Sequence, residues 1–124
     1  MAEKKKILVV DDDPDIQLRL QTVLERAGYQ VILSDDGNTG LEAAYLRKPD
    51  LIVLDLMLPG MNGYEVCKIL KTEEKCKHIP VIMFTSREDN TSHDLGKDFG
   101  VDKYLPKSVE LEQFLKTVNE FLAG

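Results

Sequence analysis

The chain of 124 residues has no tryptophan, only two cysteines and no long hydrophobic run. Its cysteines, Cys67 and Cys76, are too few for the disulfide framework of a small secreted domain. A membrane-spanning helix needs about 20 apolar residues, and no run in the sequence approaches that length. The apolar run at residues 7–10 is too short for a signal peptide, so we expect a cytoplasmic protein without membrane contact.

The sequence also lacks an excess of basic residues. There are 16 Lys and Arg against 22 Asp and Glu, which gives a formal net charge of −6. Nucleic-acid binding depends on a basic surface, so DNA or RNA is not expected as a direct ligand. Hydrophobic residues make up 43% of the chain, enough for a core that needs no disulfide or metal. We therefore predict a single domain over residues 1–124.

Short apolar runs mark the predicted strands. Residues 7–10 (ILVV), 51–54 (LIVL) and 81–84 (VIMF) are unbroken apolar runs, which are typical of parallel strands covered on both faces. Residues 29–34 and 103–105 include polar side chains, as edge strands do. The sequence therefore predicts five strands, three of them central.

Helical patterns separate these strands. Apolar residues recur at helical spacing over residues 14–27, 38–47, from Gly63 onward and over 109–122, and more weakly over 91–98. The second of these helices is expected to bury Leu41, Ala44 and Tyr45. Alternating strands and helices with short connections predict a three-layer α/β/α sandwich around one parallel sheet with five helices. Ligands in such folds bind beyond the carboxyl ends of the strands.

Acidic residues follow two of the central strands. Asp11 and Asp12 come directly after the first strand, and Asp55 comes directly after the third. Helix capping by Asp12 or Asp13 and a turn at Asp55 would explain each residue alone, but not carboxylates at both strand ends. Carboxylates held this close repel one another and recruit a cation, and oxygen ligands favour Mg²⁺. The sequence therefore predicts a magnesium pocket.

Two further strand ends point to the same place. Thr85 ends the fourth strand and Lys107 ends the fifth. With the acidic group they would complete a site for phosphoryl transfer, which needs a carboxylate nucleophile, a metal, a hydroxyl donor and an ammonium.

Four segments carry a family resemblance over essentially the whole chain: KILVVDDD, PDLIVLDLMLPGMNGYEVCKIL, IPVIMFTS and DKYLPK. The chain resembles the receiver domains of bacterial two-component response regulators, in particular those of the chemotaxis-regulator type. The resemblance implies a flavodoxin-like fold with strand order 2-1-3-4-5. It also implies a signalling domain, rather than an enzyme, that assists its own phosphorylation and dephosphorylation.

The resemblance implies roles for the acidic residues. Asp55 would be the phosphoacceptor and would take its phosphoryl group from a phosphohistidine on a sensor histidine kinase or a phosphotransfer protein. Asp11, Asp12 and Asp55 would hold Mg²⁺, helped by the backbone carbonyl of Met57.

The resemblance also implies how the signal travels. Thr85 and Lys107 would bind phosphoryl oxygens, and Tyr104 would turn inward when the threonine moves. The change would reach a downstream effector protein through the surface of the fourth helix, the fifth strand and the fifth helix. The sequence does not decide whether the domain forms a homodimer on phosphorylation. It also does not decide whether the chain acts alone or belongs to a longer regulator.

One departure from the family concerns the backbone after Lys107. The family lysine is usually followed by proline, often through a cis bond, but here Ser108 follows and Pro106 precedes. A cis bond before a residue other than proline costs about 2.5–4 kcal/mol. We therefore predict a trans Lys107–Ser108 bond, with Lys107 still reaching Asp55.

Three other functions compete with the switch. A phosphatase of the haloacid-dehalogenase type needs a second Asp two residues after the nucleophile, where this chain has Met57. A flavodoxin-like nucleotide or flavin module needs a phosphate loop, which Asp11 and its two acidic neighbours would repel. A receiver-like interaction domain that is never phosphorylated is the third alternative, and phosphorylation by a small-molecule donor would separate it from the switch.

Overall fold

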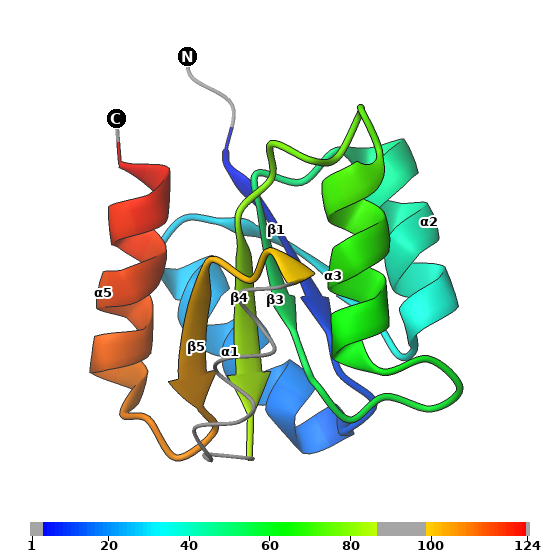
Figure 1. Cartoon of the computed structure of the whole chain (residues 1–124). Helices are drawn as coiled ribbons and strands as arrows, with labels where there is room; N and C mark the ends of the chain where they lie inside the picture. Colours follow the sequence, from blue (N-terminus) through cyan, green and yellow to red (C-terminus); the bar gives the residue numbers. More distant parts are fainter. Residues whose placement is uncertain (1–3, 87–98, 124) are drawn as a thin grey trace.

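A computed structural model describes residues 4–86 and 99–123 as a parallel sheet between two layers of helices. The strands are β1 (Lys6–Val10), β2 (Gln30–Ser34), β3 (Leu51–Leu54), β4 (Val81–Thr85) and β5 (Lys103–Pro106). All neighbours pair in parallel, in the order β2-β1-β3-β4-β5, which confirms the predicted sheet (Figure 1).

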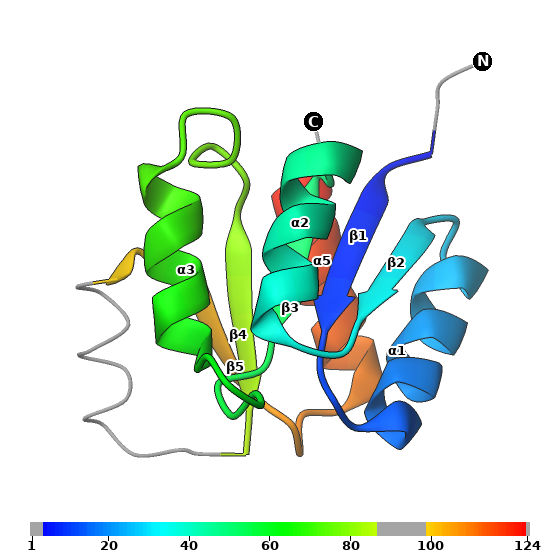
Figure 2. The same cartoon turned by 90° about the vertical axis from the view of Figure 1, so that its right-hand side faces the viewer.

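The described residues form the helices α1 (Pro14–Arg26), α2 (Gly37–Arg47), α3 (Gly63–Thr72) and α5 (Leu111–Leu122). Helices α2 and α3 cover one face of the sheet, while α1 and α5 cover the other (Figure 2). The helix predicted at residues 91–98 lies outside the described residues. None of the helices in the described part of the chain is long and apolar enough to cross a membrane.

The central strands are buried because consecutive side chains enter opposite cores. Along β1, Leu8 and Val10 pack in the core beneath α2 and α3, whereas Ile7 and Val9 pack in the core beneath α1 and α5. All four side chains are at most 1% exposed. This burial on both faces is the physical reason for the unbroken apolar runs, and it leaves the strand ends as the place for polar residues.

Local hydrogen bonds determine where the helices begin. The Asp13 carboxylate accepts the Asp15 amide at 2.9 Å, with Pro14 in the first position of α1. Helix α5 begins at Leu111 rather than at residue 109, because residues 106–109 form a turn in which the Val109 amide donates to the Pro106 carbonyl at 3.0 Å. The structure thus corrects the predicted start of this helix.

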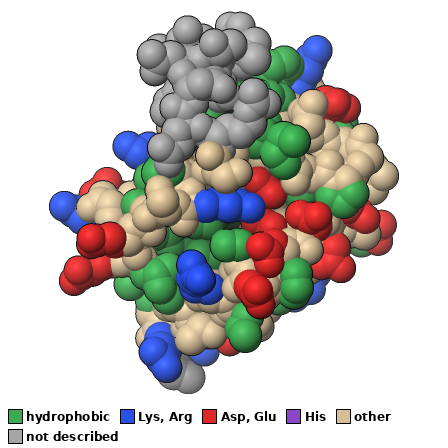
Figure 3. All heavy atoms as spheres, turned by 90° about the horizontal axis from the view of Figure 1, so that it is seen from below, with side chains coloured by type: hydrophobic (Ala, Val, Ile, Leu, Met, Phe, Trp, Pro, Cys, Tyr) green, Lys and Arg blue, Asp and Glu red, His purple; other side chains and the backbone are tan. Residues whose placement is uncertain are grey.

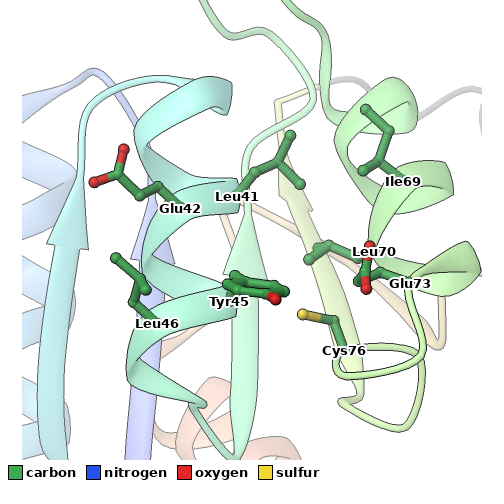
Figure 4. Close-up of a pocket in the computed structure, with 8 residues that line it drawn as sticks. All are labelled: Leu41, Glu42, Tyr45, Leu46, Ile69, Leu70, Glu73 and Cys76. Carbon is green, nitrogen blue, oxygen red and sulfur yellow. The ribbon is translucent and has the colours of Figure 1, made fainter.

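The predicted inner face of α2 is wrong at Tyr45, whose side chain is 42% exposed. Its ring lines a hollow of about 330 Å³ between α2 and α3 (Figure 4), and the Lys75 ammonium lies 4.8 Å from the ring centroid. Cys76, which lies between Lys75 and Lys77 after α3, is buried in the wall of this hollow. Tyr45 precedes β3 and Cys76 precedes β4, so the hollow lies toward the amino ends of these strands, away from Asp55.

Candidate functional site

Two neighbouring strands bring the predicted carboxylates together. Asp11 follows β1 and Asp55 follows β3, and the Asp55 amide donates to the Val10 carbonyl at 2.9 Å. One oxygen from each of Asp11, Asp12 and Asp55 can be chosen so that all three lie within 4.8 Å of one another. Asp11 and Asp55 are buried, whereas Asp12 is exposed at the rim.

Backbone amides orient the two buried carboxylates. Asp11 Oδ1 accepts the Asp13 amide at 2.9 Å, and Asp55 Oδ1 accepts the Met57 amide at 3.3 Å. The side chain that caps α1 is Asp13, so capping does not account for the carboxylate of Asp12. Each buried carboxylate is therefore held by one oxygen while its other oxygen faces the middle of the site.

Lys107 lies between the two buried carboxylates. Its ammonium is 3.0 Å from Asp11 Oδ2 and 3.2 Å from Asp55 Oδ2. Its amide donates to the Thr85 carbonyl at 2.9 Å, which ties the end of β5 to the end of β4. The Lys107–Ser108 bond is trans, and Pro106 ends an edge strand. These findings confirm the predicted trans bond and the reach of Lys107 to Asp55.

The charges at the site do not balance. Burial raises the pKa of Asp55, as does the charge of Asp11, while Lys107 and the Met57 amide offset part of this effect. Burial alone would lower the pKa of Lys107, but its hydrogen bond to Asp11 and the charge of Asp55 outweigh burial and raise it. Three carboxylates and one ammonium leave a surplus of negative charge, and this oxygen-only donor set fits Mg²⁺.

This end of the molecule is acidic beyond the three carboxylates. Figure 3 looks onto the carboxyl ends of the strands and shows acidic side chains grouped beside basic ones. Exposed Asp13, Asp15 and Asp35 follow the same strand ends or begin the next helix. A cationic or metal-bound group is therefore favoured here over a free anion.

The other predicted residues occupy the neighbouring strands. Thr85 is the last residue of β4 and is 1% exposed. The Met57 side chain is 58% exposed beside Asp55. Arg87, two residues after Thr85, lies outside the described residues.

Tyr104 has a partner that the sequence did not indicate. Its half-buried hydroxyl donates to the Tyr64 hydroxyl at 2.8 Å, and the Tyr64 ring stacks on Phe99 with centroids 5.3 Å apart. Burial raises the pKa of Tyr104, and the hydrogen bond to Tyr64 raises it further, so this hydroxyl keeps its proton. The helical pattern from Gly63 onward does not indicate this partner for Tyr64, because a bond between residues 40 apart leaves no periodic signal.

Sequence comparison identifies relatives along nearly the whole chain. The family described as response regulator receiver domain matches residues 7–119. The chain is 38% identical to protein PilH of Pseudomonas aeruginosa over 96% of its own length and 98% of PilH. It is 47% identical to the alkaline phosphatase synthesis transcriptional regulatory protein PhoP of Bacillus subtilis, over 83% of this chain but only 42% of PhoP.

Solved structures agree with the sequence matches. Chemotaxis protein CheY4 of Vibrio cholerae superposes with a TM-score of 0.91 at 30% identity, covering 96% of this chain and 99% of CheY4. The BeF3-activated N-terminal receiver domain of Klebsiella pneumoniae RstA gives a TM-score of 0.90 at 28% identity, covering 97% of this chain and 100% of that domain. The chain therefore belongs to the response regulator receiver domain family of two-component signalling.

Proposed function

We propose that this domain is a signalling switch in which Asp55 accepts a phosphoryl group from a sensor histidine kinase or a phosphotransfer protein. The observation that carries the proposal is the position of Asp55 at the end of a central strand. Its Oδ2 lies 3.2 Å from Lys107, and its carboxylate belongs to the cluster with Asp11 and Asp12. A nucleophile, a cation and a metal-binding set therefore meet at one strand end.

The transfer needs little movement at the nucleophile. An Asp55 carboxylate oxygen forms a bond to phosphorus as the bond from phosphorus to the donor histidine nitrogen breaks, and that nitrogen keeps the electron pair. Asp11, Asp12 and Asp55, with the Met57 carbonyl, would hold Mg²⁺, and the ion would neutralise charge on the transferred group. Asp55 is positioned for attack because its other oxygen accepts the Met57 amide.

The remaining residues respond to the new charge. Phosphorylation adds close to two negative charges and three acceptor oxygens. Lys107, already within 3.2 Å of Asp55, pairs with one phosphoryl oxygen, and the Thr85 hydroxyl binds another. The Thr85 carbonyl accepts the Lys107 amide, so a movement of Thr85 or Lys107 would shift the position of β5 and of the Tyr104 side chain on it. The output surface is the segment at residues 91–98, which lies outside the described residues, together with β5 and α5.

In this proposal the domain turns over no external substrate and acts only on its own phosphoryl group, in the cytoplasm. The receiver domain of RstA is described as BeF3-activated, and this supports a switch in the same fold. The phosphatase alternative is not favoured, because the exposed Met57 thioether cannot act as an acid–base group. An effector protein, or a second copy of the domain, would read the altered surface.

Acetyl phosphate with Mg²⁺ tests the assignment by intact-protein mass spectrometry. We expect one added phosphate on the wild type and none on Asp55→Asn. Asp36→Asn is the matched control, because Asp36 caps α2 through the Thr39 amide at 2.8 Å and asparagine also caps well. This control should label as the wild type does. Labelling of Asp55→Asn at a comparable rate would contradict the assignment, and an unlabelled wild type would favour the interaction domain that is never phosphorylated.

A further inference from the structure

A polar side-chain contact at each end of the segment from Tyr104 to Lys107 reaches beyond β4, the sheet neighbour of β5 in the described part of the chain. Strand β4 separates β3 from β5, yet Lys107 contacts Asp55 at 3.2 Å and the Tyr104 hydroxyl donates to Tyr64 at 2.8 Å. Tyr104 lies in β5, and Lys107 directly follows this strand, three positions later. The ion pair and the hydroxyl bond therefore act on the same short segment.

Tyr64 is held in a fixed place relative to Asp55. It follows Gly63, the first residue of α3, whose amide donates to the Leu56 carbonyl at 2.8 Å. A Cβ at Gly63 would lie 2.5 Å from the Asp55 carbonyl oxygen. The start of α3 is thus packed directly on the backbone of the phosphoacceptor candidate.

Tyr104 is held in a fixed place relative to Lys107. Tyr104 pairs with Met83 and Pro106 pairs with Thr85 in the β4–β5 register, and the Lys107 amide continues the ladder to the Thr85 carbonyl. The backbone between the two side chains is therefore extended and paired. Any displacement of Tyr104 along or away from β4 is passed to Lys107.

We propose that Tyr64 is a positioning residue for the Asp55 site: its hydroxyl accepts the Tyr104 bond, clamps β5 to α3 across β4, and so keeps the Lys107 ammonium against Asp55. The hydrogen bond and the ion pair close one ring through Asp55, Gly63, Tyr64, Tyr104 and Lys107. The clamp itself does not depend on the proposed function. Only its consequence rests on that function: the clamp would hold the positive charge of Lys107 where the phosphoryl group on Asp55 needs it.

A hydroxyl deletion separates this role from packing. Tyr64→Phe keeps the ring that stacks on Phe99 and removes the hydroxyl that accepts the Tyr104 bond. Tyr29→Phe is the matched control, because the Tyr29 hydroxyl also bonds to a side chain, Asn119, far from the acidic cluster. Circular dichroism and thermal unfolding of each variant establish that it is folded.

The readout is the acetylation rate of Lys107 by trace acetic anhydride, in metal-free protein and by peptide mass spectrometry. Lys71 is the internal reference: it is 19% exposed, against 21% for Lys107, and it donates to the Ile79 carbonyl at 2.7 Å as well as to Asp102 at 2.9 Å, so it stays paired if β5 moves. Because Lys71 lies on α3, general loosening of that helix would raise both rates. We expect Tyr64→Phe to raise the Lys107 to Lys71 ratio by about two- to tenfold, the range for one hydrogen bond. Tyr29→Phe should leave the ratio unchanged.

Removing the bond from its other end gives an independent measurement. Tyr104→Phe should raise the same ratio by a similar factor, and the double variant with Tyr64→Phe should add nothing further. An unchanged ratio in folded Tyr64→Phe, or additive effects in the double variant, would overturn the clamp. If Tyr64→Phe does not fold, the Tyr104→Phe ratio decides alone.

The same samples keep the two proposals apart. Acetylation is measured without metal or phosphodonor, so it does not depend on phosphorylation. A raised ratio with no phosphate on the wild type would support the clamp and contradict the proposed function. A phosphorylated wild type, together with an unchanged Lys107 to Lys71 ratio in Tyr64→Phe, would support the proposed function and contradict the clamp.

Discussion

The carboxylate of Asp55 and the ammonium of Lys107 form an ion pair of 3.2 Å across β4, the strand that separates β3 from β5. The same ammonium lies 3.0 Å from Asp11, so two buried carboxylates share one positive charge. The resulting surplus of negative charge determines how the metal-free domain responds to pH and to substitution.

Asp55→Asn should stabilise the metal-free domain at neutral pH. Burial and the charge of Asp11 hold the pKa of Asp55 above its ordinary value, so the folded state binds this proton more tightly than the unfolded chain does. The stabilisation is complete below the ordinary carboxyl pKa and is lost as the pH rises through the raised pKa. Urea unfolding with a chelator should show a gain in the free energy of unfolding at neutral pH that shrinks on acidification.

Asp36→Asn is the control for this pH effect. Hydrogen bonds from Thr39 lower the pKa of Asp36, so its charged form is favoured in the folded state. Its replacement should therefore give no gain at neutral pH. A variant Asp55→Asn that is less stable than the wild type at every pH would show that the Lys107 ion pair outweighs burial and repulsion.

Asp12→Ala should weaken Mg²⁺ binding without loss of metal-free stability. Asp12 is exposed and contributes to the carboxylate cluster, whereas the cap of α1 is Asp13. Removing one of several like charges relieves repulsion. Asp13→Ala is the matched comparison and should cost about 1 kcal/mol through loss of the cap. Isothermal titration with Mg²⁺ and thermal unfolding with a chelator measure the two effects, and a clear loss of metal-free stability in Asp12→Ala would refute the assignment.

Met57→Asn should speed loss of the phosphoryl group, on the proposed function. The 58% exposed Met57 side chain lies beside Asp55 and cannot orient a water molecule by hydrogen bonding. An amide can, and one hydrogen bond corresponds to a change of about tenfold in rate. Decay of the phosphorylated protein after removal of the donor measures this. Leu46→Asn, at another exposed apolar position, should decay as the wild type does, and equal decay in both variants would count against the role of Met57.

Asp102→Ala should destabilise the domain by about 2 kcal/mol, because it leaves the buried Val81 amide without its side-chain acceptor and removes one of two acceptors of the Lys71 ammonium, which keeps the Ile79 carbonyl at 2.7 Å. Asp102 Oδ2 accepts the Val81 amide at 2.7 Å and the Lys71 ammonium at 2.9 Å. The contrast is Glu74→Ala, which removes an exposed pair with Lys77 and should change little. Urea unfolding measures both, and equal losses would show that the buried amide contributes nothing beyond the charge.

The sequence predicted features that depend on neighbouring residues. Strands buried on both faces require unbroken apolar runs, so the sequence predicted β1, β3 and β4. It also predicted a role for the aspartates directly after β1 and β3. Contacts between distant side chains were not visible. The Tyr64–Tyr104 bond joins residues 40 apart, and Asp102 meets Val81 across 21 residues. Neither contact follows a helical or strand period, because each depends on how α3 and β5 pack after the sheet has formed.

Pro106 has a consequence for how partners can attach to β5. The Lys107 amide points toward β4, so the backbone position of Pro106, one residue earlier, points away from β4, to the side where no described strand pairs with β5 and where proline has no hydrogen to donate. The outer edge of this short strand therefore offers an incomplete ladder to an incoming strand. A binding partner is expected to recognise this side of the domain through side chains and helices rather than by extending the sheet.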